Sequence, residues 1–82
     1  MTEAQLRSFP AFQRLPVYDE KDQRADTITT AFTSGPYRRV RECSTLAEVE
    51  ACLKDARLVA LGALRTEPDG DAVVVAYFGE RA

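Results

Sequence analysis

Two neighbouring segments near the end of the chain are apolar on both faces, and this constrains the fold more than any other feature. Leu58–Thr66 and Asp71–Gly79 each have the length of a β-strand. Glu67-Pro-Asp-Gly70 between them suits a type I turn followed by a bulge, with Glu67 opposite Asp71. An antiparallel hairpin with one wet face would alternate apolar and polar residues. We therefore expect this hairpin to be covered on both sides.

The predicted register gives the hairpin one face of small residues and one of larger residues. The first face would carry Leu58, Ala60, Gly62, Leu64, Val74, Ala76 and Phe78. The second would carry Val59, Leu61, Ala63, Val73, Val75 and Tyr77. A helix could approach the first face closely. We expect the N-terminal segment with Phe9, Phe12 and Leu15 to cover the second; otherwise a second copy of the chain or another protein would do so.

One helix is well marked before this hairpin. Thr45-Leu-Ala-Glu48 has the pattern of a capping box, and Leu46, Val49, Leu53 and Ala56 follow helical spacing. Acidic residues near the start and basic residues near the end match the helix dipole. The pattern predicts a helix over residues 46–56, with Cys52 in the core beside the apolar stripe.

A second hairpin is predicted from Thr27–Thr33, the turn Ser34-Gly-Pro36 and the returning strand Tyr37–Cys43. A three-residue loop would place Ile28, Phe32 and Val40 on one face. The opposite face would then carry Thr27, Thr29, Thr33, Tyr37, Arg39 and Arg41. A one-residue slip would divide the three apolar side chains between the two faces, so we prefer this register.

Residues 1–26 are predicted to form an irregular or short-helical segment that packs on the core. Thr2-Glu-Ala-Gln5 has the pattern of a second capping box and could begin a short helix that ends near Ser8. Leu15–Tyr18 could form a short edge strand, because an edge tolerates Pro16. The charged stretch over residues 19–26 is expected to be a solvated loop.

Together these elements predict a single α+β domain over residues 1–82. Residues 27–79 would form a hairpin–helix–hairpin (ββαββ) unit with one helix packed on the sheet. The chain is 45% apolar and 29% charged, which is ordinary for a globular protein. No apolar stretch approaches the roughly 20 residues of a membrane-spanning helix, and Met1–Arg7 does not resemble a secretory signal. We therefore expect a soluble, cytoplasmic protein with no role at the membrane.

Several classes of site are disfavoured by composition. The chain has no histidine, which removes Ser–His and Cys–His nucleophile pairs and the usual zinc ligand sets. It has no glycine-rich phosphate loop. Its net charge of −2 also argues against nucleic-acid binding, which generally requires a basic excess. We predict no catalytic, cofactor or metal site, and these observations favour a binding protein over an enzyme.

Cys43 is the one exception that needs weighing. It lies two residues before the predicted helix cap Thr45, and a thiol near a helix N-terminus can have a lowered pKa. A thiol-dependent enzyme or redox protein is therefore an alternative. A buried, unreactive Cys43 is the simpler interpretation, because free cysteine is among the most buried residue types. Two cysteines do not indicate a disulfide scaffold.

The remaining candidate site is the outer face of the hairpin predicted over residues 27–43. Its residues are Thr29, Thr33, Tyr37, Arg38, Arg39 and Arg41. A solvated sheet face is the simplest interpretation of its threonines. However, arginine and tyrosine are enriched in interface hot spots, and guanidinium groups match carboxylates.

The leading hypothesis is a small, non-catalytic protein-binding module that contacts an acidic surface of another protein through this face. Accessory subunits, immunity or antitoxin proteins and phage-type inhibitors share its profile. A homodimer that forms through the hairpin at residues 58–79 and encloses a small ligand is a further alternative.

Overall fold

A four-stranded mixed sheet organises the computed structural model, which describes residues 1–19, 37–66 and 73–81. The strands are β1 (Val17–Asp19), β2 (Tyr37–Cys43), β3 (Leu58–Arg65) and β4 (Val74–Arg81). Their order across the sheet is β1-β3-β4-β2. β4 pairs antiparallel with both β3 and β2, whereas β1 runs parallel to β3.

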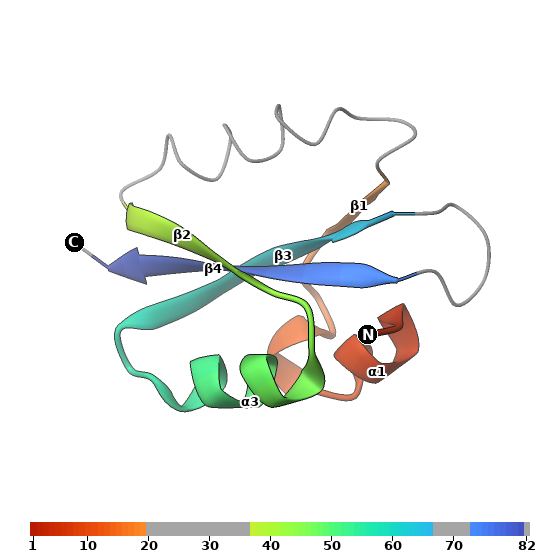
Figure 1. Ribbon diagram of the computed structural model, residues 1–82, viewed down its shortest axis with the longest axis horizontal. Helices are drawn as coiled ribbons and strands as arrows, with labels where there is room; N and C mark the ends of the chain where they lie inside the picture. Colours follow the sequence, from red (N-terminus) through yellow and green to blue (C-terminus); the bar gives the residue numbers. More distant parts are fainter. Residues whose placement is uncertain (20–36, 67–72, 82) are drawn as a thin grey trace.

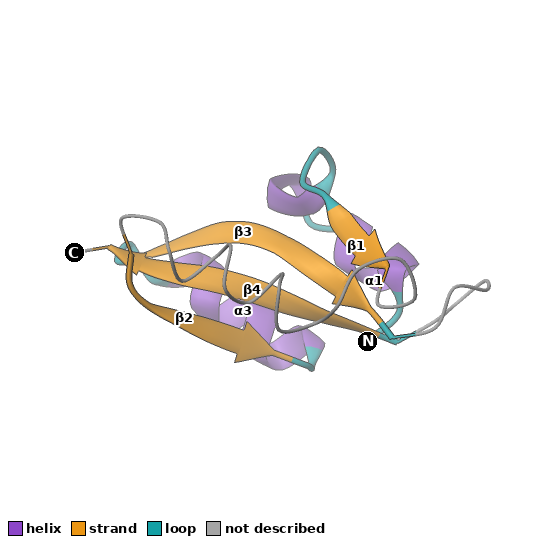
Figure 2. Ribbon diagram, turned by 90° about the horizontal axis from the view of Figure 1, so that it is seen from above, coloured by secondary structure: helices purple, strands orange, loops and turns teal. Residues whose placement is uncertain are grey.

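Three helical segments accompany the sheet. They are α1 (Glu3–Arg7), the short 3-10 helix η1 (Pro10–Phe12) and α3 (Leu46–Lys54). Figure 1 shows α1 and α3 on the same face of the sheet, and Figure 2 shows β1 and β2 on opposite sides of the central pair β3 and β4. The predicted class, a small α+β domain, is therefore confirmed.

The predicted ββαββ order is only partly reproduced. The first strand of the predicted N-terminal hairpin, with Thr29 and Thr33, lies outside the described residues. β2 has the predicted bounds, and its neighbour among the described strands is β4. β1 overlaps the short edge strand predicted at Leu15–Tyr18 and lies at the end of the strand order. Its parallel pairing with β3, which was not predicted, makes the sheet mixed rather than a pair of antiparallel hairpins.

The short helix α1 follows from its capping residues. The Thr2 hydroxyl accepts a hydrogen bond from the Gln5 backbone N–H at 3.2 Å, and the Gln5 side chain accepts one from the Thr2 N–H at 3.0 Å. This is the reciprocal arrangement that the sequence pattern predicts. Leu6 is fully buried, and Arg65 of β3 forms an ion pair with Glu3, so α1 is fastened to the sheet at both of these points.

Helix α3 begins as predicted and ends earlier. Thr45 caps its start by accepting a hydrogen bond from the Glu48 N–H at 3.2 Å. The chain leaves the helix at Asp55, whose backbone is extended and whose carboxylate accepts the Arg57 N–H at 2.9 Å. The prediction that the helix reaches Ala56 is therefore wrong, and Ala56 is exposed. Val49 and Cys52 supply its buried face.

A bulge in β3 changes which side chains share a face. Ala60 pairs with Phe78 while Gly62 pairs with Tyr77, so β3 contains one residue more than β4 between these pairs. Gly62 has a φ of 148°, which favours glycine. Beyond the bulge the alternation is reversed, and the predicted faces of Ala63 and Leu64 are wrong. Ala63 joins the core beneath the helices, and Leu64 lies on the opposite face.

The main core lies between the sheet and the three helical segments. Phe12 of η1 meets Phe78 of β4 edge to face, with ring centroids 5.5 Å apart. Leu6 is buried in the same core, and Phe9 and Leu15 pack against it. The N-terminal segment therefore covers the same face as α3, and the prediction that it covers the second face is wrong. The N-terminal segment and α3 can pack side by side on one face, because the small residues Ala60, Ala63 and Ala76 of the sheet leave room for their apolar side chains.

The second face of the sheet has its own apolar cluster. Leu64 and Tyr77 are buried there. Partly buried residues around them are Tyr18, Val40, Leu61 and Val75. The prediction that another copy of the chain, or another protein, covers part of this face remains a prediction.

Candidate functional site

The arginines of β2 are divided from Tyr37 by a second bulge. Tyr37 pairs with Arg81, and Arg39 pairs with the preceding residue of β4, Glu80, so Arg38 is the additional residue in β2. From Arg39 onward the strand alternates regularly toward Cys43, which is buried in the core beneath the helices. Arg39 and Arg41 therefore lie on the α3 side of the sheet.

Tyr37 lies on the other side of the sheet. A Cβ atom placed on Gly79 would come within 2.6 Å of Cγ and Cδ1 of Tyr37, so the ring packs on the surface that Gly79 leaves open. Gly79 follows Phe78, which faces the helices, and so presents the opposite face. The structure thus brings Arg39 and Arg41 together and separates them from Tyr37, which the sequence had placed on their face.

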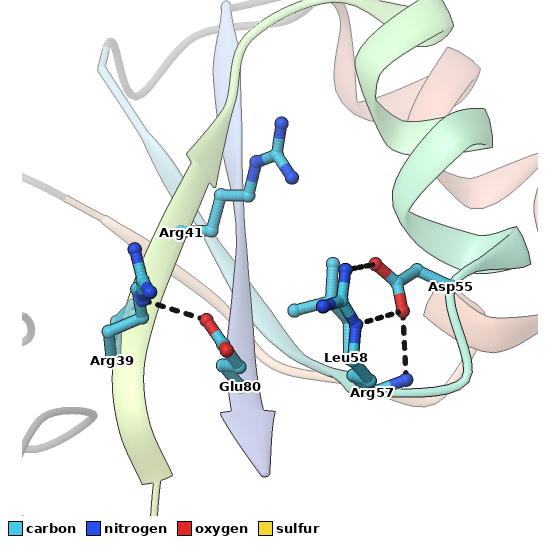
Figure 3. Close-up of a pocket in the computed structure, with 7 residues that line it drawn as sticks. Arg39, Arg41, Asp55, Arg57, Leu58 and Glu80 are labelled. Atoms are coloured by element: carbon cyan, nitrogen blue, oxygen red, sulfur yellow. Dashed lines mark hydrogen bonds and ion pairs between the residues drawn. The ribbon is translucent and has the colours of Figure 1, made fainter.

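Arg39 and Arg41 line a pocket at one end of the sheet. Its volume is about 250 Å³. The lining residues are Arg39, Val40 and Arg41 of β2, Asp55 and Arg57 of the α3–β3 connection, Leu58 of β3 and Glu80 of β4. Three arginines and two carboxylates surround it, which leaves one net positive charge. Figure 3 shows these side chains on β2, β3, β4 and the connection that follows α3.

Two of the pocket arginines are held by carboxylates. Arg39 Nε lies 2.8 Å from Glu80 Oε2, and Arg57 Nη2 lies 3.0 Å from Asp55 Oδ2 (Figure 3). The side-chain hydrogen bond from Arg57 lowers the pKa of Asp55 and, together with the backbone bond from the Arg57 N–H, keeps it ionised. Solvent screens pairs of this kind, so they add little to stability. Their main effect is to fix the direction of Arg39 and Arg57.

Arg41 differs from these two arginines. It is exposed, and within residues 1–19, 37–66 and 73–81 it has no ion pair. Figure 3 shows its side chain extending from β2 on the side of the sheet where α3 lies. The neighbouring Arg38 is likewise exposed and without an ion pair in the described part of the chain, but it does not line the pocket. Of the three pocket arginines, Arg41 is thus the one without a carboxylate at ion-pair distance among the described residues.

The environment of Cys43 opposes a nucleophilic role. Cys43 is fully buried, and its Sγ lies 3.1 Å from Sγ of Cys52. Burial, reinforced by the hydrogen bond to Cys52, raises the pKa of Cys43 from its ordinary value of 9.0 to about 12. An activated thiol needs a shift in the other direction. The geometry therefore favours the structural interpretation of both cysteines.

Sequence reasoning missed five of the seven pocket residues: Val40, Asp55, Arg57, Leu58 and Glu80. Asp55 and Arg57 were assigned to the end of the helix, although the Asp-x-Arg spacing after a helix could have indicated a local side-chain pair. Glu80 was placed beyond the end of its strand. Its position opposite Arg39 depends on the pairing of β2 with β4, for which the sequence carries no local signal.

Other kinds of site find little support. Among the described residues, no group of three or more acidic, cysteine or histidine side chains could hold a metal ion. No helix in this part of the chain is long and apolar enough to cross a bilayer. Comparison with protein-family models, curated proteins and solved structures finds no match for this chain.

Proposed function

We propose that this protein is a small, non-catalytic protein-binding module that contacts an acidic surface of another protein through the arginines of β2. The observation that carries the proposal is that the guanidinium group of Arg41 is exposed and unpaired among the described residues. Beside it at the pocket, Arg39 and Arg57 are already held by carboxylates. A carboxylate of a partner could therefore bind Arg41 without first displacing a carboxylate of residues 1–19, 37–66 or 73–81.

The pocket also offers more than charge. Val40 and Leu58 provide apolar surface among the arginines, and the ion pairs of Arg39 and Arg57 reduce the side-chain freedom lost on binding. Arg38 adds a positive charge to the same strand. An accessory subunit, an immunity or antitoxin protein and a phage-type inhibitor would each fit this arrangement, acting in the cytoplasm. Thr29 and Thr33, the other members of the predicted surface, lie outside the described residues.

The alternative of a thiol-dependent enzyme has less support, because burial raises the pKa of Cys43 to about 12. The alternative of a homodimer through residues 58–79 rests on the apolar second face. Val73, 54% exposed, is the large hydrophobic residue with the greatest exposure among those described.

Affinity capture with charge-reversal variants tests the proposal. Tagged wild-type protein, the Arg39→Glu/Arg41→Glu variant and an Arg14→Glu control would be incubated with lysate of the source cells. Arg14 is exposed and lies in the connection to β1, at the far edge of the sheet, so it controls for the loss of positive charge. We expect a stoichiometric protein that the wild type and Arg14→Glu retain and the double variant loses. Equal capture by all three folded proteins would contradict the assigned surface.

The single variant Arg41→Glu sharpens the test once a partner has been captured. Reversing one charge at a close ion pair weakens binding by at least about tenfold. Calorimetry of Arg41→Glu and Arg14→Glu against the same partner would separate the role of Arg41 from a general effect of charge.

A further inference from the structure

The two cysteines of the chain form a buried contact between β2 and α3. Cys43 is the last residue of β2, and Cys52 is the third residue from the end of α3. Their Sγ atoms are 3.1 Å apart, and both residues are almost completely excluded from solvent, at 0% and 2% exposure. Both are free thiols in this structure.

We propose that Cys43 and Cys52 form a reversible disulfide that staples α3 to β2 when the protein meets a disulfide oxidant. A disulfide bond is about 2.0 Å long, so the two sulfur atoms need to approach by only about 1 Å. The chain has no other cysteine that could compete for either partner within the molecule. This inference does not depend on the proposed binding function.

The reaction is an exchange with a small-molecule disulfide such as glutathione disulfide. One protein thiol loses its proton and attacks a sulfur of the oxidant, which releases one thiol and leaves a mixed disulfide. The second protein thiol then loses its proton and displaces the second thiol. The two cysteines are oxidised by two electrons, and the oxidant is reduced to two thiol molecules.

Burial controls the rate of this exchange rather than its direction. Neither sulfur is accessible while α3 rests on the sheet, and the raised pKa of Cys43 leaves little thiolate in the closed structure. A helix of nine residues has little stability of its own, so it can separate from the sheet by local opening. After the first exchange, reclosure brings the second sulfur beside the mixed disulfide and displaces the bulky adduct from the core.

The test uses wild-type protein incubated with glutathione disulfide at mildly alkaline pH. We expect intact mass spectrometry to show the loss of two hydrogen atoms with no glutathione attached, and thiol titration in denaturant to find no free thiol. The bridge closes a loop of about ten residues in the unfolded chain. We therefore expect Tm to rise by about 10 °C and to return to its original value after reduction.

The single variants Cys43→Ala and Cys52→Ala serve as controls, because neither can lose two hydrogen atoms within one chain. Three results would overturn the proposal. One is an end product made of glutathione adducts or intermolecular dimers. Another is a pair of thiols that persists in the native protein while a denatured sample oxidises. The third is an oxidised monomer that melts below the reduced protein.

Discussion

Replacing Gly79 by alanine tests the position of Tyr37, on which the division of the candidate surface depends. The new Cβ would lie 2.6 Å from two ring atoms of Tyr37, closer than any ordinary carbon contact. Overpacking of this kind costs about 1–3 kcal/mol. Alanine in place of glycine in a strand regains about 0.5–1 kcal/mol. We expect a net loss of about 1 kcal/mol, which lowers Tm by about 4–8 °C in a domain of this size.

Making Gly79→Ala in a variant that lacks the Tyr37 ring tests whether the loss of stability comes from contact with that ring. The three atoms nearest to a Cβ at Gly79 all belong to the Tyr37 ring. In the Tyr37→Ala background the same substitution should therefore stabilise the protein, by about 0.5 kcal/mol. The four proteins to compare are the wild type, Gly79→Ala, Tyr37→Ala and the double variant. Their urea unfolding, followed by far-UV circular dichroism, gives the effect of Gly79→Ala on the free energy of unfolding in each background. An effect of the same sign and size in the two backgrounds would refute the placement of Tyr37 over Gly79.

Three other substitutions or conditions test separate parts of the fold. Gly62→Ala forces a side chain into a φ of 148° at the bulge, and we expect a loss of about 1–3 kcal/mol; an unchanged urea midpoint would contradict the bulge. Thr45→Ala removes the cap of α3 and should cost about 1 kcal/mol, while Thr45→Ser should retain most of it when both are compared by thermal melting. The raised pKa of Cys43 means that above pH 9.0 the unfolded chain releases this proton and the folded chain does not, until about pH 12. The free energy of unfolding should therefore fall across this range by up to about 1.4 kcal/mol per pH unit, and denaturant titrations should find a shallower fall in Cys43→Ala.

The features that the sequence predicted correctly are governed by nearby residues. The starts of α1 and α3 depend on Thr2 with Gln5 and on Thr45 with Glu48, pairs that are three residues apart. Such contacts form wherever these residues meet in a helix, so they can be recognised without knowledge of the fold. The bounds of β2 were predicted for a similar reason, since its residues favour a strand and its end lies against a helix cap.

The bulge in β3 could not be located from the apolar pattern. In a strand that is wet on one face, a shift of one residue exposes an apolar side chain or buries a polar one, and the pattern reports it. Ala63 and Leu64 are both apolar, so exchanging their faces leaves no such sign. Gly62 was the single local hint, because an isolated glycine within a strand often marks a bulge.

The candidate pocket was only half predictable, because its two halves meet through pairing between distant strands. Arg39 and Arg41 could be selected by residue type. Their neighbours Glu80 and Asp55 come from the far end of β4 and from the end of α3, and nothing close to Arg39 in the sequence indicates either contact. The bulge at Arg38, which turns Tyr37 away, likewise arises from the pairing with β4.

The central claim, that Arg41 is the anion-binding group of this surface, is tested most directly by nuclear magnetic resonance of the arginine side chains. The ¹⁵N-labelled protein would be titrated with a glutamate-rich peptide and, as a matched control, with a glutamine-rich peptide of equal length. We predict that the Nε–Hε signal of Arg41 moves with the acidic peptide, while that of Arg14 and all signals with the neutral peptide stay in place. An Arg41 signal that does not move, or that moves equally with both peptides, would contradict the account.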